Sequence, residues 1–402
     1  MKRTLIILFL FILSAYPMVA QTKQPLVLGF RDTIASKILG EKRGLLIHLP
    51  NTPPDEFAPD QKYPVIYVLD ADSYFQTVVA ISESKSGGSG NYSSPKAIIV
   101  GITNTDRTRD LSPTHWVDSS LIPASMLSSS GGGEKFLAFL EKELIPYIDS
   151  VYPAAPHRTI MGHSLGGLTA IHALLHHKGV FQTYVSLDPT TWWEKENWIH
   201  AAEKNLLKDD YSNESLFLAI AHSADKNLSL AAVKADTDIH TLPMRSELNF
   251  DVYVTSIIAT HPLNYQSKYY PDYNHGSVAL PGIVDAMDFI YDFYYINFPW
   301  PGFFAPDSKD DDKLRAHYDM VSKRLGYKVS PPGELFNAIA HELMGNQQFD
   351  RAKKYLELNL QNYPKSYLSY EAMGEYYKRR GETLLSENYY KKATAMKANE
   401  KR

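Results

Sequence analysis

The chain of 402 residues contains no cysteine. That absence excludes disulfide bonds, thiolate catalysis, cysteine-ligated zinc and a lipid-modified cysteine at an N-terminal cleavage site. An excess of positive charge is also missing, because 41 lysines and arginines stand against 45 acidic residues. The chain therefore lacks the basic footprint of a nucleic-acid-binding protein, and we expect no nucleic-acid partner.

Long apolar runs are missing everywhere except near the N-terminus, where Leu5 to Leu13 are apolar. Two basic residues precede that run and small residues follow it near Ala20. This order is typical of a secretory signal peptide, residues 1–20. We therefore expect an exported chain, periplasmic or extracellular, with no integral membrane segment after cleavage. An uncleaved anchor is the alternative, because Met18 is a poor residue at a cleavage site.

Between about residues 25 and 300, short β-branched runs alternate with helical patterns. Such alternation predicts an α/β domain, a mostly parallel sheet with helices on both faces. Phe136, Leu140, Leu144 and Ile148 recur at helical spacing, so we expect a helix with one buried face there. The expected strands are 44–50, 63–70, 96–102, 158–162, 183–188 and 215–221.

Prolines and a charge run mark a boundary near residue 300, and we treat 301–330 as a linker. The region 331–402 is helical and repeats with a period of 34, so that Phe336 matches Tyr370 and Ala340 matches Gly374. This spacing resembles two tetratricopeptide repeats. We expect them to dock on the α/β domain or to bind a protein partner or a second copy. A helical hairpin that only caps the chain is the alternative.

The motif Gly-His-Ser-Leu-Gly-Gly follows a predicted strand and precedes a predicted helix. A Gly-x-Ser-x-Gly turn in this position presents its serine hydroxyl above the sheet edge, which makes Ser164 a candidate nucleophile. The N–H of Leu165, at the start of the helix, is a candidate oxyanion donor. A tight structural turn without chemistry is the alternative.

A serine nucleophile needs a base, and 14 histidines compete for that role. His275 is our candidate, because it stands on a Pro/Asn/Gly loop after an alternating tyrosine run and before the last strong helix. His172 and His176 are one helical turn apart and could suggest a metal. Without a third ligand in reach, we interpret them as a solvated helix face and predict no metal.

The acid that orients the base is predicted to be Asp225, which follows the strand 215–221 by four residues. Asp236 and Asp238 are its nearest rivals, and a Ser–His pair without an acid is a further possibility.

Four motifs, "YVLDADSYF", "VGITNTDRTRDLSPT", "GHSLGG" and "YPDYNHGSV", are similar to those of the putative-esterase family of α/β-hydrolases. The resemblance covers about residues 26–300 and is closest to the siderophore-esterase-like branch. It implies an α/β-hydrolase fold, Ser164 as nucleophile, His275 as base and an acid near Asp225. It also implies a second oxyanion donor at the N–H of Asp72, and no metal or organic cofactor.

The chain departs from the family pattern at three places. Ala71 stands where glycine is common, Asp188-Pro189-Thr190 replaces Ser-Pro-Ser, and Asp225 stands where glutamate is common. Trp192 and Trp193 follow the second departure and are predicted to wall a substrate pocket, with plain coverage of the sheet as the alternative.

Arg107 could steer an anionic substrate, although an Arg–Asp pair with a structural role is the preferred interpretation of this loop. Together these features predict a secreted serine hydrolase of carboxylic esters that acts through an acyl-enzyme. Its substrate would be a small-molecule or carbohydrate-linked ester. There are two alternatives. The enzyme could transfer the acyl group to an alcohol other than water, or the α/β domain could be catalytically inert and the chain could recruit partners through residues 331–402.

Overall fold

The computed structural model describes residues 26–50, 61–87, 92–296, 300–309 and 311–400. The predicted signal peptide lies outside these residues. Within them, no helix combines the length and the apolar character that crossing a membrane requires.

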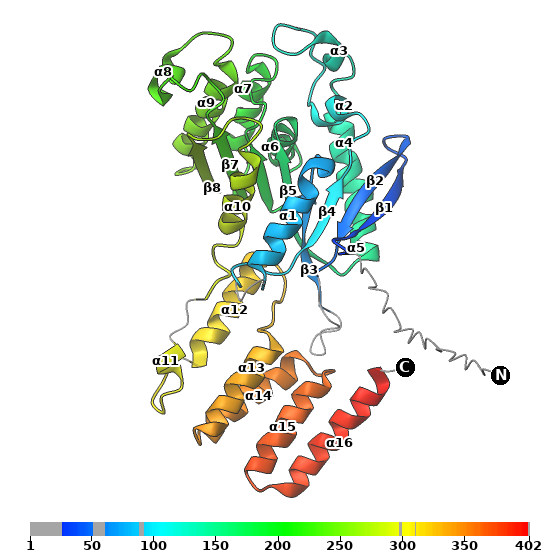
Figure 1. The fold of residues 1–402 in the computed structure, drawn as a ribbon, viewed down its shortest axis with the longest axis vertical. Coiled ribbons are helices and arrows are strands. Elements are labelled where there is room, and N and C mark those ends of the chain that lie inside the picture. The colour runs from blue at the N-terminus through cyan, green and yellow to red at the C-terminus, as the bar shows by residue number, and fades with distance from the viewer. Residues whose placement is uncertain (1–25, 51–60, 88–91, 297–299, 310, 401–402) are drawn as a thin grey trace, which may run out of the picture.

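One mixed sheet of eight strands forms the centre of the body, in the order β1-β2-β4-β3-β5-β6-β7-β8 (Figure 1). The two pairings that involve β2 are antiparallel and the other five are parallel. The strands are β1 (Phe30–Ser36), β2 (Glu41–His48), β3 (Tyr63–Val68), β4 (Ile98–Ile102), β5 (Ala154–His163), β6 (Thr183–Leu187), β7 (Tyr211–Ala221) and β8 (Leu263–Tyr270). The predicted α/β class and the mostly parallel sheet are confirmed.

All six predicted strands are present, and the two that were not named are the edge strands β1 and β8. An edge strand is covered on fewer sides, so it lacks the continuous apolar run of a central strand. In β8, exposed and partly buried residues alternate between two buried ends, and β1 is mostly exposed. Their sequences therefore resemble loops more than buried strands.

Helices cover both faces of the sheet. One buried cluster joins the sheet to α4, α6, α7 and α9, and a second joins the other face to α1, α10 and α12. The helices of the body are α1 (Ala71–Lys85), α2 (Arg107–Leu111), α3 (Ala124–Leu127), α4 (Gly133–Phe139), α5 (Ile145–Val151), α6 (Leu165–His176), α7 (Asn197–Glu203), α8 (Leu230–Ala235), α9 (Leu242–Ile257) and α10 (Ala279–Ile290). A 3-10 turn at Lys204–Leu207 follows α7.

The helix predicted around Phe136 runs from α4 to α5, and a π-helical turn at Leu140–Leu144 joins the two. Phe136, Leu140, Leu144 and Ile148 are all fully buried, which confirms the predicted face. The π turn inserts one extra residue into the helical path, and such turns occur mostly as single-turn irregularities.

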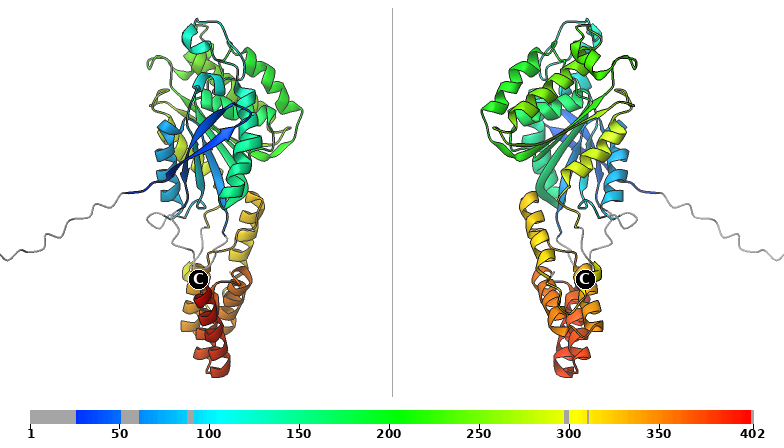
Figure 2. Two further views of the ribbon diagram at one scale, coloured as in Figure 1. Left: turned by 90° about the vertical axis from the view of Figure 1, so that its right-hand side faces the viewer. Right: turned by 90° about the vertical axis from the view of Figure 1, so that its left-hand side faces the viewer.

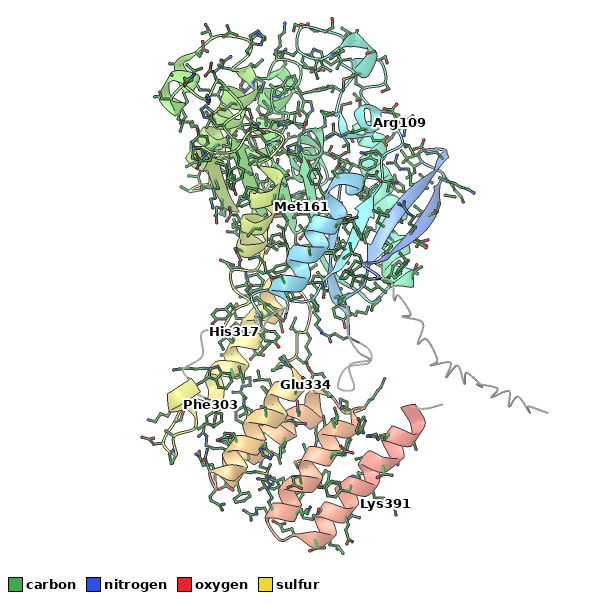
Figure 3. All side chains as sticks on the ribbon, viewed as in Figure 1. Arg109, Met161, Phe303, His317, Glu334 and Lys391 are labelled. Atoms are coloured by element: carbon green, nitrogen blue, oxygen red, sulfur yellow. The ribbon has the colours of Figure 1, made fainter. Side chains whose placement is uncertain are left out.

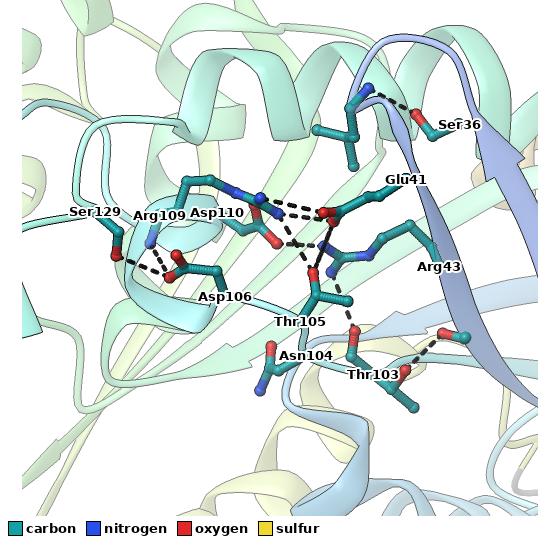
Figure 4. Close-up of polar contacts among 12 residues, drawn as sticks. Ser36, Glu41, Arg43, Thr103, Asn104, Thr105, Asp106, Arg109, Asp110 and Ser129 are labelled. Atoms are coloured by element: carbon teal, nitrogen blue, oxygen red, sulfur yellow. Dashed lines mark hydrogen bonds and ion pairs between the residues drawn. The ribbon is translucent and has the colours of Figure 1, made fainter.

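An ion-pair network ties the hairpin of β1 and β2 to the loop after β4 (Figure 4). Arg43 is fully buried and donates hydrogen bonds to Glu41, Thr105 and the carboxylate of Asp110. Arg109 bonds to Glu41 and to Asp110 as well. The hydrogen bond from Arg109 lowers the pKa of Glu41 to about 2. Arg109 and Asp110 thus form part of a structural ion-pair network in this loop.

The C-terminal region consists of two helical hairpins, α13 (Gly333–Gly345) with α14 (Phe349–Asn362) and α15 (Tyr367–Arg379) with α16 (Thr383–Glu400). Corresponding helices of the two hairpins begin 34 residues apart, which is the predicted period. Gly374 contacts the Tyr390 ring, which lies 3.1 Å from the position of a Cβ on this glycine. The assignment to the tetratricopeptide class stays a prediction.

The segment treated as a linker contains α11 (Trp300–Phe303) and α12 (Asp311–Leu325). Helix α12 runs between the body and the C-terminal hairpins (Figures 1 and 2). Its Val321 and Leu325 pack in the body, while Leu314 packs with the hairpins. His317 lies midway along it and bonds to the Tyr294 carbonyl (Figure 3). The hairpins therefore dock on the body through this helix.

We expect Asp110→Ala to lower the free energy of unfolding by about 3–5 kcal/mol, because it removes the buried carboxylate of the Arg43 ion pair and leaves only the partly exposed Glu41. Urea denaturation measures this change. The matched control is Asp312→Ala, which removes an exposed carboxylate from the pair with Arg315 and should change stability by less than about 0.5 kcal/mol. Equal effects of the two variants would contradict a buried pair at Asp110.

Candidate active site

Ser164 occupies a sharp turn between β5 and α6. Its backbone has φ 60° and ψ −119°, a conformation that costs energy for a residue with a side chain. The turn is held on both sides, because the Ser164 N–H bonds to the Leu187 carbonyl and the Ser164 carbonyl accepts from the N–H of Thr190. The predicted strand-turn-helix arrangement is confirmed.

Gly162 is required by a backbone contact. A Cβ on Gly162 would lie 2.3 Å from the carbonyl carbon and oxygen of Gly166, which no rearrangement of side chains could relieve. A Cβ on Gly166 would lie 3.4 Å from the Leu69 side chain, an ordinary van der Waals contact. The absence of a side chain at Gly162 lets α6 approach β5 closely, and this approach produces the strained turn at Ser164.

His275 lies on the loop between β8 and α10, beside the same sheet edge. Its Nδ1 is 2.6 Å from the Asp188 carboxylate, so Nδ1 carries a proton and Nε2 is left as the acceptor. Asn274 shapes the loop, since its side chain accepts from the Gly276 N–H and its carbonyl accepts from the Ser277 N–H. About half of the His275 side chain is exposed, which leaves Nε2 accessible to a substrate.

Asp188, at the carboxyl end of β6, is almost fully buried. Burial alone would raise the pKa of its carboxyl, but hydrogen bonds from His275, the Ala221 N–H and Glu247 outweigh burial and lower this pKa. Asp188 is therefore an anion beside the imidazole. A buried carboxylate that accepts from Nδ1 holds the imidazole in the tautomer and orientation that general-base catalysis needs.

Glu247, on α9, is a functional candidate that the sequence analysis missed. It is buried beside the Asp188 carboxylate. Burial, together with the charge of Asp188, raises the pKa of Glu247 well above its usual range. The neutral acid can donate its proton to the Asp188 carboxylate. No sequence motif marks Glu247, because only the fold brings α9 against the end of β6.

The structure does not bring the predicted acid, Asp225, to His275, whose Nδ1 is bonded to Asp188 instead. Asp225 is exposed and its carboxylate accepts from the N–H and side-chain amide of Asn227, in a surface turn. Its rivals Asp236 and Asp238 also cap local turns. The sequence departure at Asp188 was therefore the informative signal, since a carboxylate there replaces the serine common in the family.

His163 positions the His275 loop. Its Nε2 donates to the His275 carbonyl at 2.7 Å, so its Nδ1 is the acceptor for the Tyr74 hydroxyl at 3.0 Å. The rings of His163 and His275 lie 4.5 Å apart. Burial lowers the pKa of His163, and the nearby His275 lowers it further. A neutral His163, the residue directly before Ser164, is thus bonded to the backbone of His275.

The Ser164 hydroxyl lies 3.3 Å from the hydroxyl of Thr190 and makes no hydrogen bond to His275 in this structure. Thr190 is two residues after Asp188, so the β6 loop contacts both Ser164 and His275. In unliganded enzymes, catalytic hydrogen bonds are often long and shorten only when substrate binds. A proton transfer from Ser164 to His275 therefore stays a prediction.

Leu165 and Asp72 both lie in first turns of helices, where backbone N–H groups have no carbonyl partner within the helix. Leu165 is the first residue of α6, and Asp72 is the second residue of α1, which begins directly beyond β3. Asp70, between β3 and α1, has a left-handed backbone conformation with φ 51°. Both amides remain candidate oxyanion donors.

Arg107 forms a two-point ion pair with Asp70, with distances of 2.8 Å and 2.9 Å. It also donates to the His163 carbonyl at 3.4 Å. The Asp70 carboxylate balances the guanidinium charge, which matches the structural interpretation of this loop. Binding of substrate by Arg107 stays a prediction.

Trp193 does not line a pocket, contrary to our prediction. Its side chain is fully buried, its indole N–H donates to Thr114, and its ring contacts Trp116 at 5.0 Å. A side chain without accessible surface cannot contact a substrate. Trp192 is only partly buried and packs on the other side of Trp116, so its role in substrate binding stays a prediction.

The comparisons with known proteins agree with this geometry. A family model described as "Putative esterase" matches residues 36–272. The ferri-bacillibactin esterase BesA of Bacillus subtilis is 35% identical over 164 residues, 38% of this chain and 54% of that protein. The siderophore triacetylfusarinine C esterase of Aspergillus fumigatus is 25% identical over 142 residues, 35% of this chain and 48% of that protein. The chain thus spans about half the length of these curated relatives.

Among solved structures, an IroE-like serine hydrolase from Shewanella oneidensis superposes with a TM-score of 0.68 and 27% identity. The match covers 83% of this chain and 99% of that one. The matched part of the chain is therefore longer than the α/β body, residues 25–300, alone. The α/β architecture of the body is therefore one that occurs in a known serine hydrolase.

Asp188→Asn should lower kcat for p-nitrophenyl acetate by about 10²–10⁴, because the amide cannot hold the His275 imidazole in the required tautomer. Asp225→Asn is the matched control, the same substitution in an exposed turn, and should leave kcat within twofold. The two variants are compared by steady-state kinetics on folded protein verified by circular dichroism. A loss of activity in the Asp225 variant and none in the Asp188 variant would reverse the assignment.

Proposed function

Because the chain belongs to the putative esterase family, we propose that it is a serine hydrolase of carboxylic esters that acts through an acyl-enzyme on Ser164. The observation that carries this proposal is the pairing of His275 with the buried Asp188, beside the strained turn that presents Ser164. A nucleophile, a base and an acid from three different parallel strands meet at one sheet edge, which is where sites form in this class of fold.

In the proposed first half-reaction, the Ser164 hydroxyl attacks the ester carbonyl carbon while Nε2 of His275 takes its proton. The carbonyl oxygen becomes an oxyanion, which the N–H groups of Leu165 and Asp72 bind. Each donor of this kind contributes about 3 kcal/mol in the transition state. The intermediate then expels the alcohol, which receives its proton from His275, and leaves an ester on Ser164.

In the second half-reaction, water repeats these steps on the acyl-enzyme. His275 takes a proton from the water as its oxygen attacks, and returns a proton to the Ser164 oxygen as the acid leaves. Asp188 stays ionised throughout and stabilises the imidazolium that forms twice per cycle. The donation from the neutral Glu247 keeps Asp188 from being an isolated buried charge.

The substrate class that we propose is a siderophore ester. It rests on the relatives whose names state an action on ferri-bacillibactin and triacetylfusarinine C. We also propose that the enzyme is exported, on the N-terminal pattern of 1–20, and that its C-terminal hairpins serve as a docking region for a protein partner.

Ser164→Ala and His275→Ala should each lower kcat for p-nitrophenyl acetate by about 10³-fold or more, since the triad acts as a unit. Ser256→Ala, on the exposed side of α9, is the control and should retain full activity. Full activity in Ser164→Ala would overturn the proposed reaction. If added alcohol changed the main product from the free acid to a new ester of that alcohol, the protein would instead be an acyl transferase.

Ferri-bacillibactin and triacetylfusarinine C, incubated with the enzyme, should each gain the mass of one water for every ester cleaved, as measured by mass spectrometry. Ser164→Ala, incubated in parallel, gives the background. Acetylated xylan serves as the competing carbohydrate ester. Cleavage of xylan acetate or p-nitrophenyl acetate, without cleavage of either siderophore, would contradict the substrate class and leave the reaction type intact.

A further inference from the structure

Five ligating side chains meet at the end of α6 that lies away from Ser164. We call them the histidine cluster, and its members are Glu134, Glu141, His172, His176 and His177. His172 Nε2 is 2.6 Å from one oxygen of Glu134, and His177 Nε2 is 3.2 Å from the other. His177 Nδ1 is 3.2 Å from Glu141.

The fold supplies the ligands that the sequence did not show. His172 and His176 are one turn apart on α6, and their rings lie 4.9 Å apart. Glu134 comes from α4, about forty residues earlier, and Glu141 comes from the π-helical turn that follows it. Our expectation that His172 belongs to a solvated face is wrong, because His172 is buried and only His176 is exposed.

The donor atoms of Glu134, His172 and His176 all lie within 4.8 Å of one another. Around tetrahedral zinc, donor atoms at about 2.0–2.1 Å from the metal are roughly 3.3 Å apart. The Glu134 side chain is more than half exposed and can move toward the metal, while the buried His172 keeps its place. Imidazole and carboxylate are ligands that zinc and its neighbours in the first transition series accept.

We propose that Glu134, His172 and His176 bind one divalent transition-metal ion of the zinc type. The ion would link α6 to α4 as a structural clamp. His172 and His176 are eight and twelve residues beyond Ser164, so the two ligands lie about 12 Å and 18 Å along the helix from that turn. The ion therefore takes no part in the chemistry at Ser164.

A second group in the described residues consists of His163, Asp188 and His275, whose donor atoms also lie within 4.8 Å of one another. Its ring nitrogens are engaged differently, because His163 bonds to Tyr74 and to the His275 carbonyl, and His275 Nδ1 bonds to Asp188. The bond between His275 and Asp188 belongs to the proposed triad, and His163 positions the His275 loop. The experiment must therefore distinguish the two places.

The test is a calorimetric titration of tag-free, chelator-treated full chain with ZnCl₂, compared across single variants. We expect one site in the wild type, and a dissociation constant raised at least tenfold by Glu134→Gln and by His176→Ala. Both changes are at exposed side chains, so the fold should persist. His240→Ala, which removes an exposed histidine outside the cluster, should bind zinc like the wild type.

Two further readouts locate the ion. CoCl₂ should produce the visible absorption of tetrahedral cobalt in the wild type and in His275→Ala, but not in His176→Ala. Zinc should raise the unfolding temperature of the wild type and of His240→Ala, and not that of His176→Ala. Absence of binding, unchanged binding in both cluster variants, or loss of binding only in His275→Ala would each overturn the proposal.

Discussion

The contact between the backbones of Gly162 and Gly166 is the constraint on which the site depends. No room exists there for a methyl group, since a Cβ on Gly162 would lie 2.3 Å from the carbonyl of Gly166. The close approach of α6 to β5 forces the residue between them into its strained conformation. Helix α6 begins at the next residue, Leu165, so the proposed nucleophile and its proposed oxyanion donor both come from this one turn.

The parallel sheet supplies the remaining partners. Strands β5, β6 and β8 end at the same edge, and Ser164, Asp188 and His275 each follow one of them. Asp188 also spans the end of β7, because its carboxylate accepts from the Ala221 N–H and its own N–H bonds to the Ala219 carbonyl. Ser223, in the loop after β7, donates its hydroxyl to the same carboxylate at 3.2 Å. Together these contacts hold the carboxylate beside the His275 loop.

The features that depend on residues close together in the sequence were predicted from sequence patterns. The central strands, the amphipathic helix at Phe136, the turn at Ser164 and the period of 34 all follow from spacing along the chain. The edge strands were missed because partial exposure removes the apolar run. The acid was misplaced, and Glu247 and the cluster around His172 were missed, because each depends on contacts between residues far apart in sequence. Trp193 was misjudged because burial of a side chain at a strand end is a tertiary property.

The role of Ser164 as the nucleophile is tested most directly by the site at which a fluorophosphonate probe modifies the chain, mapped by peptide mass spectrometry. We expect one adduct per chain, on Ser164, with a labelling rate that falls sharply in His275→Ala and in Asp188→Asn. An adduct on another serine, or full esterase activity in protein whose Ser164 is unmodified after complete reaction, would contradict this role.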